Sequence, residues 1–226
     1  MSTIWSVSEA QRGARAPLRG EPSTPERIAG AALRAFASAG YAATSLDALA
    51  AELGLSKQTI LYHFGSKEGL LDAVIDDAGA AVVGVVEAAL DGVDSGGPGW
   101  PRVVASVRST FRLAGRRPEL LGLLREVSRL GPPPATRLRA RLDPFVASAT
   151  AFLEGEMAAG RMRRQDARLL LLSAYSTVIG AATEVEVLES FGLHPAARTL
   201  VRRRAELLEF LASALLPPPG RAAPAG

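Results

Sequence analysis

Apolar residues recur at helical spacing along most of the chain, and no run of alternating apolar and polar residues indicates a strand. Alanine, leucine and arginine, which all favour helices, are the most frequent residues. The pattern therefore predicts an all-α fold. The predicted helices span residues 25–39, 46–53, 57–63, 67–90, 100–114, 119–129, 135–159, 165–190 and 196–215. Pro144 either kinks the helix over 135–159 or starts a new one.

The two ends of the chain contain glycine and proline and show little apolar periodicity. We expect a disordered arm over residues 1–22 and a disordered tail over 217–226. Between them the predicted helices fall into two groups, namely three short helices over residues 23–66 and a larger helical bundle over 67–216.

The third predicted helix lies in the stretch SKQTILYHFGSK, residues 56–67, which has no acidic residue and holds both lysines of the chain. A helix of seven residues is not stable alone, so the two helices before it must hold it. Ile60 and Phe64 fall on the face that would pack against them, and Gly54 favours a turn. This arrangement is a helix-turn-helix, whose second helix enters the major groove of DNA.

The residue types left on the outside of this helix fit contacts with DNA. Lysine and glutamine, at positions 57 and 58, can hydrogen-bond to base edges, whereas tyrosine and histidine, at 62 and 63, can donate to phosphates. Position 67 lies at the N-terminus of the next predicted helix, where free N–H groups also favour an anion. The predicted DNA-binding residues are Thr44, Ser45, Ser56, Lys57, Gln58, Thr59, Leu61, Tyr62, His63 and Lys67.

The charge is distributed unevenly, although the chain carries a net charge of only +3. Residues 1–70 hold 7 basic and 6 acidic side chains, residues 71–100 hold 6 acidic and no basic ones, and residues 101–226 hold 19 basic and 11 acidic ones. The first third therefore lacks the broad basic block of a general polyanion binder, and a small, placed surface must bind any nucleic acid.

Residues 40–71, GYAATSLDALAAELGLSKQTILYHFGSKEGLL, resemble the DNA-binding region of the TetR family of bacterial transcriptional regulators. The similarity extends over about residues 24–75 and includes the Gly-Tyr pair, the serine-capped recognition helix that ends in phenylalanine, and the Ser-Lys-Glu that follows. Many members have a tyrosine, often used on phosphate, at the place of Leu61. Here Tyr62 comes one residue later, so either Leu61 or Tyr62 would meet the DNA backbone.

The resemblance implies that residues 67–216 form a ligand-binding and dimerisation domain, in which a small molecule changes the separation of two DNA-binding heads. On the helices where such a pocket would be expected lie Phe111, Phe145, Phe152 and Tyr175, so the unidentified ligand is expected to be apolar. The last two predicted helices carry wide apolar faces. Paired about a two-fold axis, they would give a four-helix interface between two copies of the chain.

The sequence shows no group of side chains that would support catalysis. It has no cysteine and only two histidines, and no histidine–carboxylate cluster has the spacing of a metal site. We therefore expect no enzymatic activity, no cofactor and no metal. The absence of cysteine fits a reducing cytoplasm, and the apolar stretch over residues 169–182 is shorter than the roughly 20 residues that a membrane-spanning helix needs.

Together these features predict a cytoplasmic DNA-binding regulator, namely a ligand-released repressor that binds a pseudo-palindromic operator as a homodimer. The expected partners are double-stranded operator DNA, a second copy bound through the last two helices, and a small apolar ligand, but no membrane. The alternative is a helical ligand-binding or interaction module without sequence-specific DNA binding.

Overall fold

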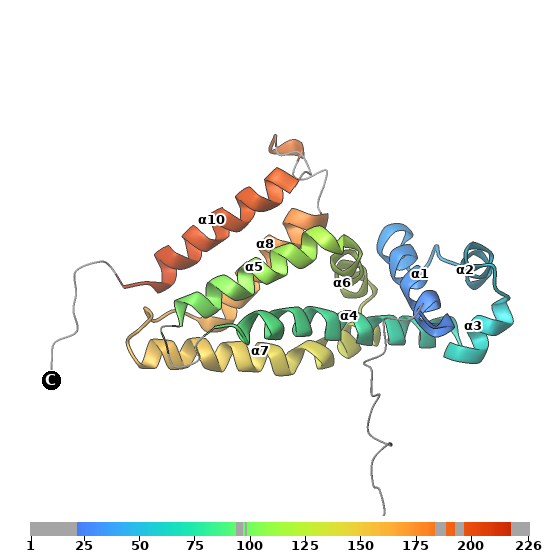
Figure 1. Ribbon diagram of the computed structural model, residues 1–226, viewed down its shortest axis with the longest axis horizontal. Coiled ribbons are helices and arrows are strands. Elements are labelled where there is room, and N and C mark those ends of the chain that lie inside the picture. Colours follow the sequence, from blue (N-terminus) through green and yellow to red (C-terminus); the bar gives the residue numbers. More distant parts are fainter. Residues whose placement is uncertain (1–21, 94–96, 98, 184–188, 193–196, 218–226) are drawn as a thin grey trace, which may run out of the picture.

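The computed structural model describes residues 22–93, 97, 99–183, 189–192 and 197–217 of the chain (Figure 1). These residues form helices joined by turns and loops, with no strand among them, which confirms the predicted all-α fold. The helices are α1 (Thr24–Ala39), α2 (Leu46–Leu53), α3 (Lys57–Phe64), α4 (Lys67–Leu90), α5 (Trp100–Arg116), α6 (Pro118–Leu130), α7 (Pro134–Ala158), α8 (Ala167–Thr183) and α10 (Ala197–Leu215).

Serine side chains cap the N-termini of three helices, α2, α3 and α4. The hydroxyls of Ser45, Ser56 and Ser66 accept hydrogen bonds from the backbone N–H groups of the third residue of α2, α3 and α4, at 3.1, 3.1 and 3.0 Å. Such caps satisfy N–H groups that have no partner within the helix. Ser45, rather than the neighbouring Thr44, is thus the cap of α2. Gly54 ends α2 with a left-handed φ of 66°, a conformation that glycine adopts without steric cost.

Helices α1, α2 and α3 form the head of the molecule, which packs around a small apolar core. Ile28, Phe36 and Ile60 are completely buried in it, and Leu49 is 2% exposed. Ile60 is therefore the residue through which α3 is anchored, as its helical spacing predicts. Phe64, the second predicted inward residue, is half-buried and packs against the same core.

Helix α4 leads from the head into the body, which consists of α5, α6, α7, α8 and α10 (Figure 1). It packs against α1 and α3 at its beginning and against α5 and α7 further along. Helix α6 provides a second connection because it packs along α1, and a Cβ atom at Gly122 would lie 3.1 Å from the Cβ of Ala37. Glu126 of α6 also accepts a hydrogen bond of 2.9 Å from the backbone N–H of Tyr41, just after α1. The head is thus held by two helices of the remaining chain.

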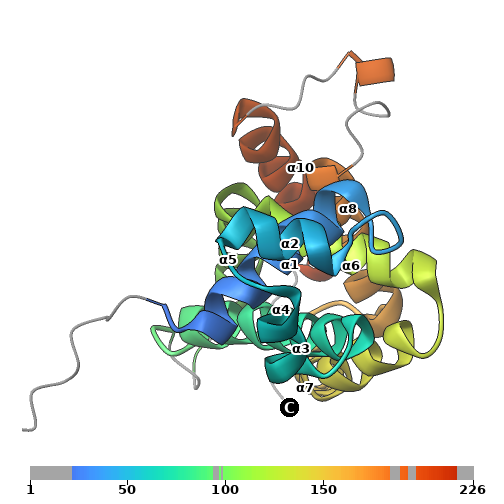
Figure 2. The same cartoon turned by 90° about the vertical axis from the view of Figure 1, so that its right-hand side faces the viewer.

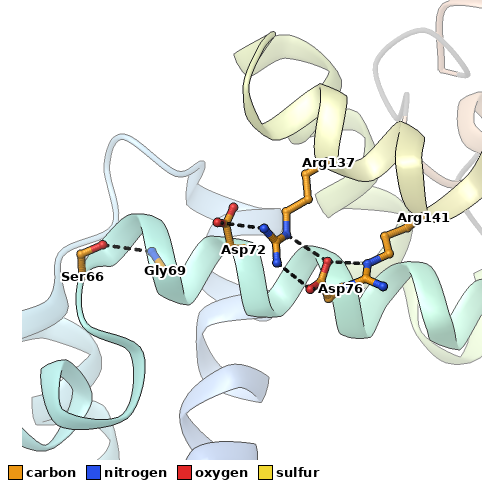
Figure 3. A network of polar contacts seen from close by, with 6 residues as sticks. All are labelled: Ser66, Gly69, Asp72, Asp76, Arg137 and Arg141. Carbon is orange, nitrogen blue, oxygen red and sulfur yellow. Dashed lines mark hydrogen bonds and ion pairs between the residues drawn. The ribbon is translucent and has the colours of Figure 1, made fainter.

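A polar network joins α4 to α7 near the head (Figure 3). The carboxylate of Asp76 accepts two hydrogen bonds from Arg137, at 3.0 and 2.7 Å, and two from Arg141, both at 2.7 Å. Asp72 lies one turn earlier and accepts a further bond of 3.2 Å from Arg137. Hydrogen bonds from Arg141 and then Arg137 hold the pKa of Asp76 well below its usual value. The network therefore fixes the helix that carries the head against the body.

Some helix boundaries differ from the predicted ones. Helix α3 is one residue longer, and α7 continues through Pro144 as a single helix. Helix α8 begins at Ala167 instead of 165 because the carboxylate of Asp166 accepts hydrogen bonds from the backbone N–H groups of Arg168 and Leu169 and so caps the helix. The predicted continuation of this helix includes residues 184–188, which lie outside the described part. The arm over residues 1–21 and the tail over 218–226 lie outside it as well.

Candidate nucleic-acid interface

Helix α3 lies at the end of the molecule opposite α10, with α2 beside it (Figures 1 and 2). Its inward side chains are the buried Ile60 and the half-buried Leu61 and Phe64. Tyr62 is 85% exposed, and Gln58 and His63 are exposed as well. A tyrosine ring contributes nothing to the core at such exposure, so the outer surface of α3 offers aromatic and hydrogen-bonding groups to an external partner.

Several of the predicted contact residues also form hydrogen bonds inside the head. The Ser56 hydroxyl caps α3 and lies 2.9 Å from the Thr59 hydroxyl, while Ser45 caps α2. Thr44 differs from these exposed or half-exposed residues because it is only 7% exposed. Its hydroxyl donates a bond of 2.9 Å to the carbonyl of Gly40. Thr44 therefore shapes the loop between α1 and α2 and presents almost no side-chain surface, contrary to the expectation that it faces DNA.

The basic residue at the start of α3 has an acidic neighbour in α2. The ammonium of Lys57 lies 2.9 Å from a carboxylate oxygen of Asp47, and both side chains are exposed. An ion pair in water contributes only about 0–1 kcal/mol, so a stronger anion can displace the carboxylate. Asp47 is not among the predicted site residues. Its contact with Lys57 depends on how α2 and α3 pack, and no local signal in the sequence indicates it.

Lys67, at the start of α4, is held in position by the loop after α1. Its ammonium lies 4.3 Å from the centre of the Tyr41 ring and 3.5 Å from the carbonyl oxygen of Ala42. A cation over the face of an aromatic ring is attracted by the electron density of the ring. Half-buried Lys67 thus has a fixed location beside the N-terminus of α4, where a phosphate would also meet the positive end of the helix dipole.

Tyr41 was not among the predicted site residues, although it organises this corner of the head. Its ring packs edge-on against Phe36 with 5.4 Å between the ring centres, and its hydroxyl donates a bond of 3.1 Å to Glu68. Burial, together with the hydrogen bond to Glu68, raises the pKa of Tyr41 to about 12. The Gly-Tyr pair in the sequence was the available signal, but the hydroxyl contact joins residues that are 27 positions apart.

Leu61 and Tyr62 are the two candidates for contact with the DNA backbone, and the fold exposes Tyr62. Leu61 is half-buried against the core, whereas Tyr62 projects outward. The residues from 53 to 67 contain no carboxylate. A phosphate that approached the outer side of α3 would therefore meet hydroxyl, imidazole and amide groups without a negative charge from the helix itself.

The four residues expected around a ligand do not line a common hollow among those found between the described helices. Phe111 is buried in α5, Phe145 and Phe152 are half-buried in α7, and Tyr175 is 42% exposed on α8. The ring of Phe152 lies 5.2 Å from the guanidinium carbon of Arg102. Phe111 lines a hollow between α5 and α10, to which the other three do not contribute.

A second, wider hollow of about 720 Å³ lies between α1 and α6, and none of these four residues lines it. In the part of the chain that the structure describes, no cluster of histidine, aspartate and glutamate could hold a metal ion. None of the described helices combines the length and the apolar character needed to span a membrane.

Comparison with known proteins identifies the relatives of the head and of the whole fold. Residues 28–74 match the family model described as "Bacterial regulatory proteins, tetR family". An uncharacterised HTH-type transcriptional regulator of Bacillus subtilis, YerO, is 48% identical over 46 residues, which are 20% of this chain and 16% of that protein. This similarity is thus confined to a small part of both chains.

Solved structures extend the similarity to the body. A TetR transcriptional regulator from Chloroflexus aurantiacus has a TM-score of 0.70 and 26% identity, with 85% of this chain and 96% of that one covered. The fold is also shared by AibR, whose structure was solved with isovaleryl coenzyme A and operator DNA. There the TM-score is 0.68 and the identity 20%, over 82% of this chain and 96% of that one.

The two solved structures share the fold over more than four fifths of this chain, which is more than the helix-turn-helix head alone. The sequence resemblance over residues 40–71 is thereby confirmed. Residues 28–74 thus match the TetR family model, and the fold as a whole is similar to that of a TetR transcriptional regulator.

Proposed function

We propose that this protein is a transcriptional regulator that binds double-stranded DNA by inserting α3 into the major groove. The observation that carries the proposal is the outer surface of α3, where Gln58, Tyr62 and His63 are exposed while Ile60 anchors the helix in the core. Lys57 and Gln58 contact base edges, where lysine suits guanine and glutamine suits adenine. Tyr62, His63 and Lys67 bind phosphates and so set the position of the helix on the duplex.

The regulator binds DNA as a homodimer that forms through α8 and α10. Apolar side chains of these helices remain exposed in one copy, among them Leu169 at 61%, Leu172 at 56% and Phe210 at 52%. Burial of such surface in a second copy is favourable by roughly 25 cal/mol for each Å². A two-fold axis would place two α3 helices one turn of DNA apart, about 34–36 Å, so that the dimer reads a pseudo-palindrome.

The regulator acts as a repressor that a small ligand, bound in the body, releases from its operator. Support comes from the two connections between head and body. Helix α4 carries α3 directly, and α6 contacts Ala37 and the backbone N–H of Tyr41. Such a ligand shifts the equilibrium between two spacings of the heads, and the size of the shift is set by the difference in its affinity for the two arrangements of the body. An apolar ligand and a location in the cytoplasm remain part of the proposal.

The test begins with selection of bound duplexes from a random DNA pool, followed by titration of the selected duplex. We expect a two-fold symmetric motif and an affinity that falls steeply with salt, because binding releases counterions from the phosphates. Lys67→Gln is expected to weaken binding to all sequences and to reduce the salt dependence. Gln58→Ala is expected to relax the preference at one base pair in each half-site, at a cost of about 1–3 kcal/mol for the preferred base.

Arg164→Gln is the matched control, because Arg164 is exposed in the loop between α7 and α8 and far along the chain from α3. It should leave affinity unchanged. An asymmetric or absent motif, together with equal affinities for the Lys67, Gln58 and Arg164 variants, would favour a helical ligand-binding or interaction module instead.

A further inference from the structure

A hollow of about 240 Å³ lies between α5 and α10, away from the head. Its apolar part is formed by Phe111, Gly115, Leu200 and Val201. Three guanidinium groups complete it, from Arg112 and Arg116 of α5 and from Arg204 of α10. Figure 1 shows α10 on the side of the body remote from α3, so this hollow is separate from the proposed DNA surface.

Arg204 occupies a position on α10 that the helical pattern assigns to an apolar residue. The stripe at helical spacing that faces the body contains Leu200, Leu207, Leu211 and Leu215, of which the last three are at most 4% exposed. Arg204 falls between the first two of these leucines and is half-buried. A charged side chain on such a stripe is costly unless an opposite charge accompanies it, because burial removes part of its hydration.

No carboxylate among the described residues accompanies the three arginines of the hollow. Arg202 and Arg203, next to Arg204 in α10, both pair with Glu206, at 2.9 and 3.1 Å. By contrast, neither Arg204 nor the two arginines of α5 has such a contact in the described parts of the chain. Helix α5 itself contains four arginines and no acidic residue.

The spacing of the arginines on α5 adds a second cost. Arg108, Arg112 and Arg116 follow each other at intervals of four residues, which places like charges side by side on the helix surface. Such pairs destabilise a helix by a few tenths of a kcal/mol each. An anion bound at Arg112 and Arg116 would remove this repulsion and would also provide Arg204 with its missing counter-charge.

We propose that the hollow binds a small organic anion, with an apolar group against Phe111 and Leu200 and an oxyanion head between the guanidiniums. Carboxylate and phosphate both suit this chemistry, because arginine binds either through two parallel hydrogen bonds. The volume lies below the range of about 300–1,000 Å³ that is usual for ligand pockets, so the apolar group must be short.

Isothermal titration calorimetry of the full chain tests the proposal with three probes of similar size, namely benzoate, phenyl phosphate and neutral benzyl alcohol. We expect at least one of the two anions to bind and the alcohol not to bind, and the better anion identifies the head group. Arg204→Gln is expected to weaken anion binding at least tenfold, because a charge-assisted hydrogen bond is lost.

Two further variants make the test specific. Gly115→Leu should abolish binding without disturbing α5, because a Cβ atom at Gly115 would lie at an ordinary distance of 3.7 Å from Leu200 and the rest of the side chain would fill the hollow. Arg108→Gln should leave binding unchanged, since Arg108 is exposed on the same helix but does not line the hollow. If Arg204→Gln does not fold, as judged by circular dichroism, Arg112→Gln at an exposed position takes its place.

The proposal would be overturned if neither anion bound, or if both anions bound to the Gly115→Leu and Arg204→Gln variants as to the original chain. Equal binding of benzyl alcohol would overturn it too, because it would show an apolar site in which the arginines have no part. DNA affinity is measured separately on the same variants, so failure here would leave the proposed function untouched.

Discussion

Replacing Asp76 tests how α4, the helix that connects the head to the body, is held against α7. Its carboxylate accepts four hydrogen bonds from two arginines of α7, at 2.7–3.0 Å, and its side chain is 23% exposed. Asp76→Asn keeps the shape of the side chain but removes the charge and one of the two acceptor oxygens. It leaves both guanidiniums without their main counter-charge.

The expected loss follows from the geometry and from solvent access. Hydrogen bonds to charged groups contribute about 1.5–3 kcal/mol when they are shielded from water. The two arginine side chains are 41% and 53% exposed, so water screens the contacts, and isolated exposed pairs contribute about 0–1 kcal/mol. For the whole network around Asp76 we expect a loss of about 2 kcal/mol in the free energy of unfolding. In a chain of this size that corresponds to a fall of about 4–8 °C in Tm.

The assay is thermal unfolding followed by circular dichroism at equal protein concentration, with Asp77→Asn as the control. Asp77 is the next residue on α4 and is exposed, so its replacement should change Tm little. Because hydrogen bonding lowers the pKa of Asp76 in the folded state, its stabilising effect is fully present above the unfolded pKa of about 3.9 and is lost as the pH falls further.

The difference between the original chain and Asp76→Asn should thus stay constant from pH 8 to about pH 5 and shrink below about pH 4. Equal falls in Tm for Asp76→Asn and Asp77→Asn would show that the stability depends on the overall charge of α4 and not on the contact of Asp76 with α7. A difference that stayed constant far below pH 4 would contradict the assignment of the effect to the ionised carboxylate.

Three other predictions concern the head, its contact with the body and the interface between copies. Absorbance titration should show one of the three tyrosines ionising only near pH 12, and Tyr41→Phe should remove that step; a Tyr41→Phe chain that retained it would refute the assignment. Gly122→Ala should lower the free energy of unfolding, measured in urea, by about 1–2 kcal/mol, although alanine favours helices. The reason is that the new Cβ would lie 3.1 Å from the Cβ and 3.2 Å from the carbonyl oxygen of Ala37. Unchanged stability would mean that α1 and α6 separate easily. Leu172→Glu should convert a dimer into monomers in sedimentation equilibrium, because it places a charge in an apolar interface, and a Leu172→Glu dimer of unchanged strength would place the interface elsewhere.

The helices of the head could be predicted because the signals that start, end and orient them are local. A serine before each of α2, α3 and α4 caps the helix within three residues, and Gly54 ends α2 where positive φ is required. The helical spacing of Ile60 also predicted which face of α3 turns inward. The exposure of Tyr62 and Gln58 follows from that choice, because a helix with one face buried must present the other to its surroundings.

Contacts between distant segments could not be predicted in the same way. The sequence places Thr44 one residue before Ser45, yet loop geometry buries the first and exposes the second. Lys57 meets Asp47, and Lys67 meets the ring of Tyr41, only because α2, α3 and the loop after α1 fold against one another. None of these pairs has a periodic signature.

The sequence by itself determined that this protein is helical, where most helices begin, and which short helix presents a polar face, because caps, turns and apolar periodicity act over a few residues. Only the tertiary structure decided that Asp76 meets α7, that Gly122 lies against α1, and that Arg204 shares a hollow with two arginines of α5. These contacts join residues far apart in the chain. They depend on the angles and distances at which whole helices pack, which are set jointly by many side chains.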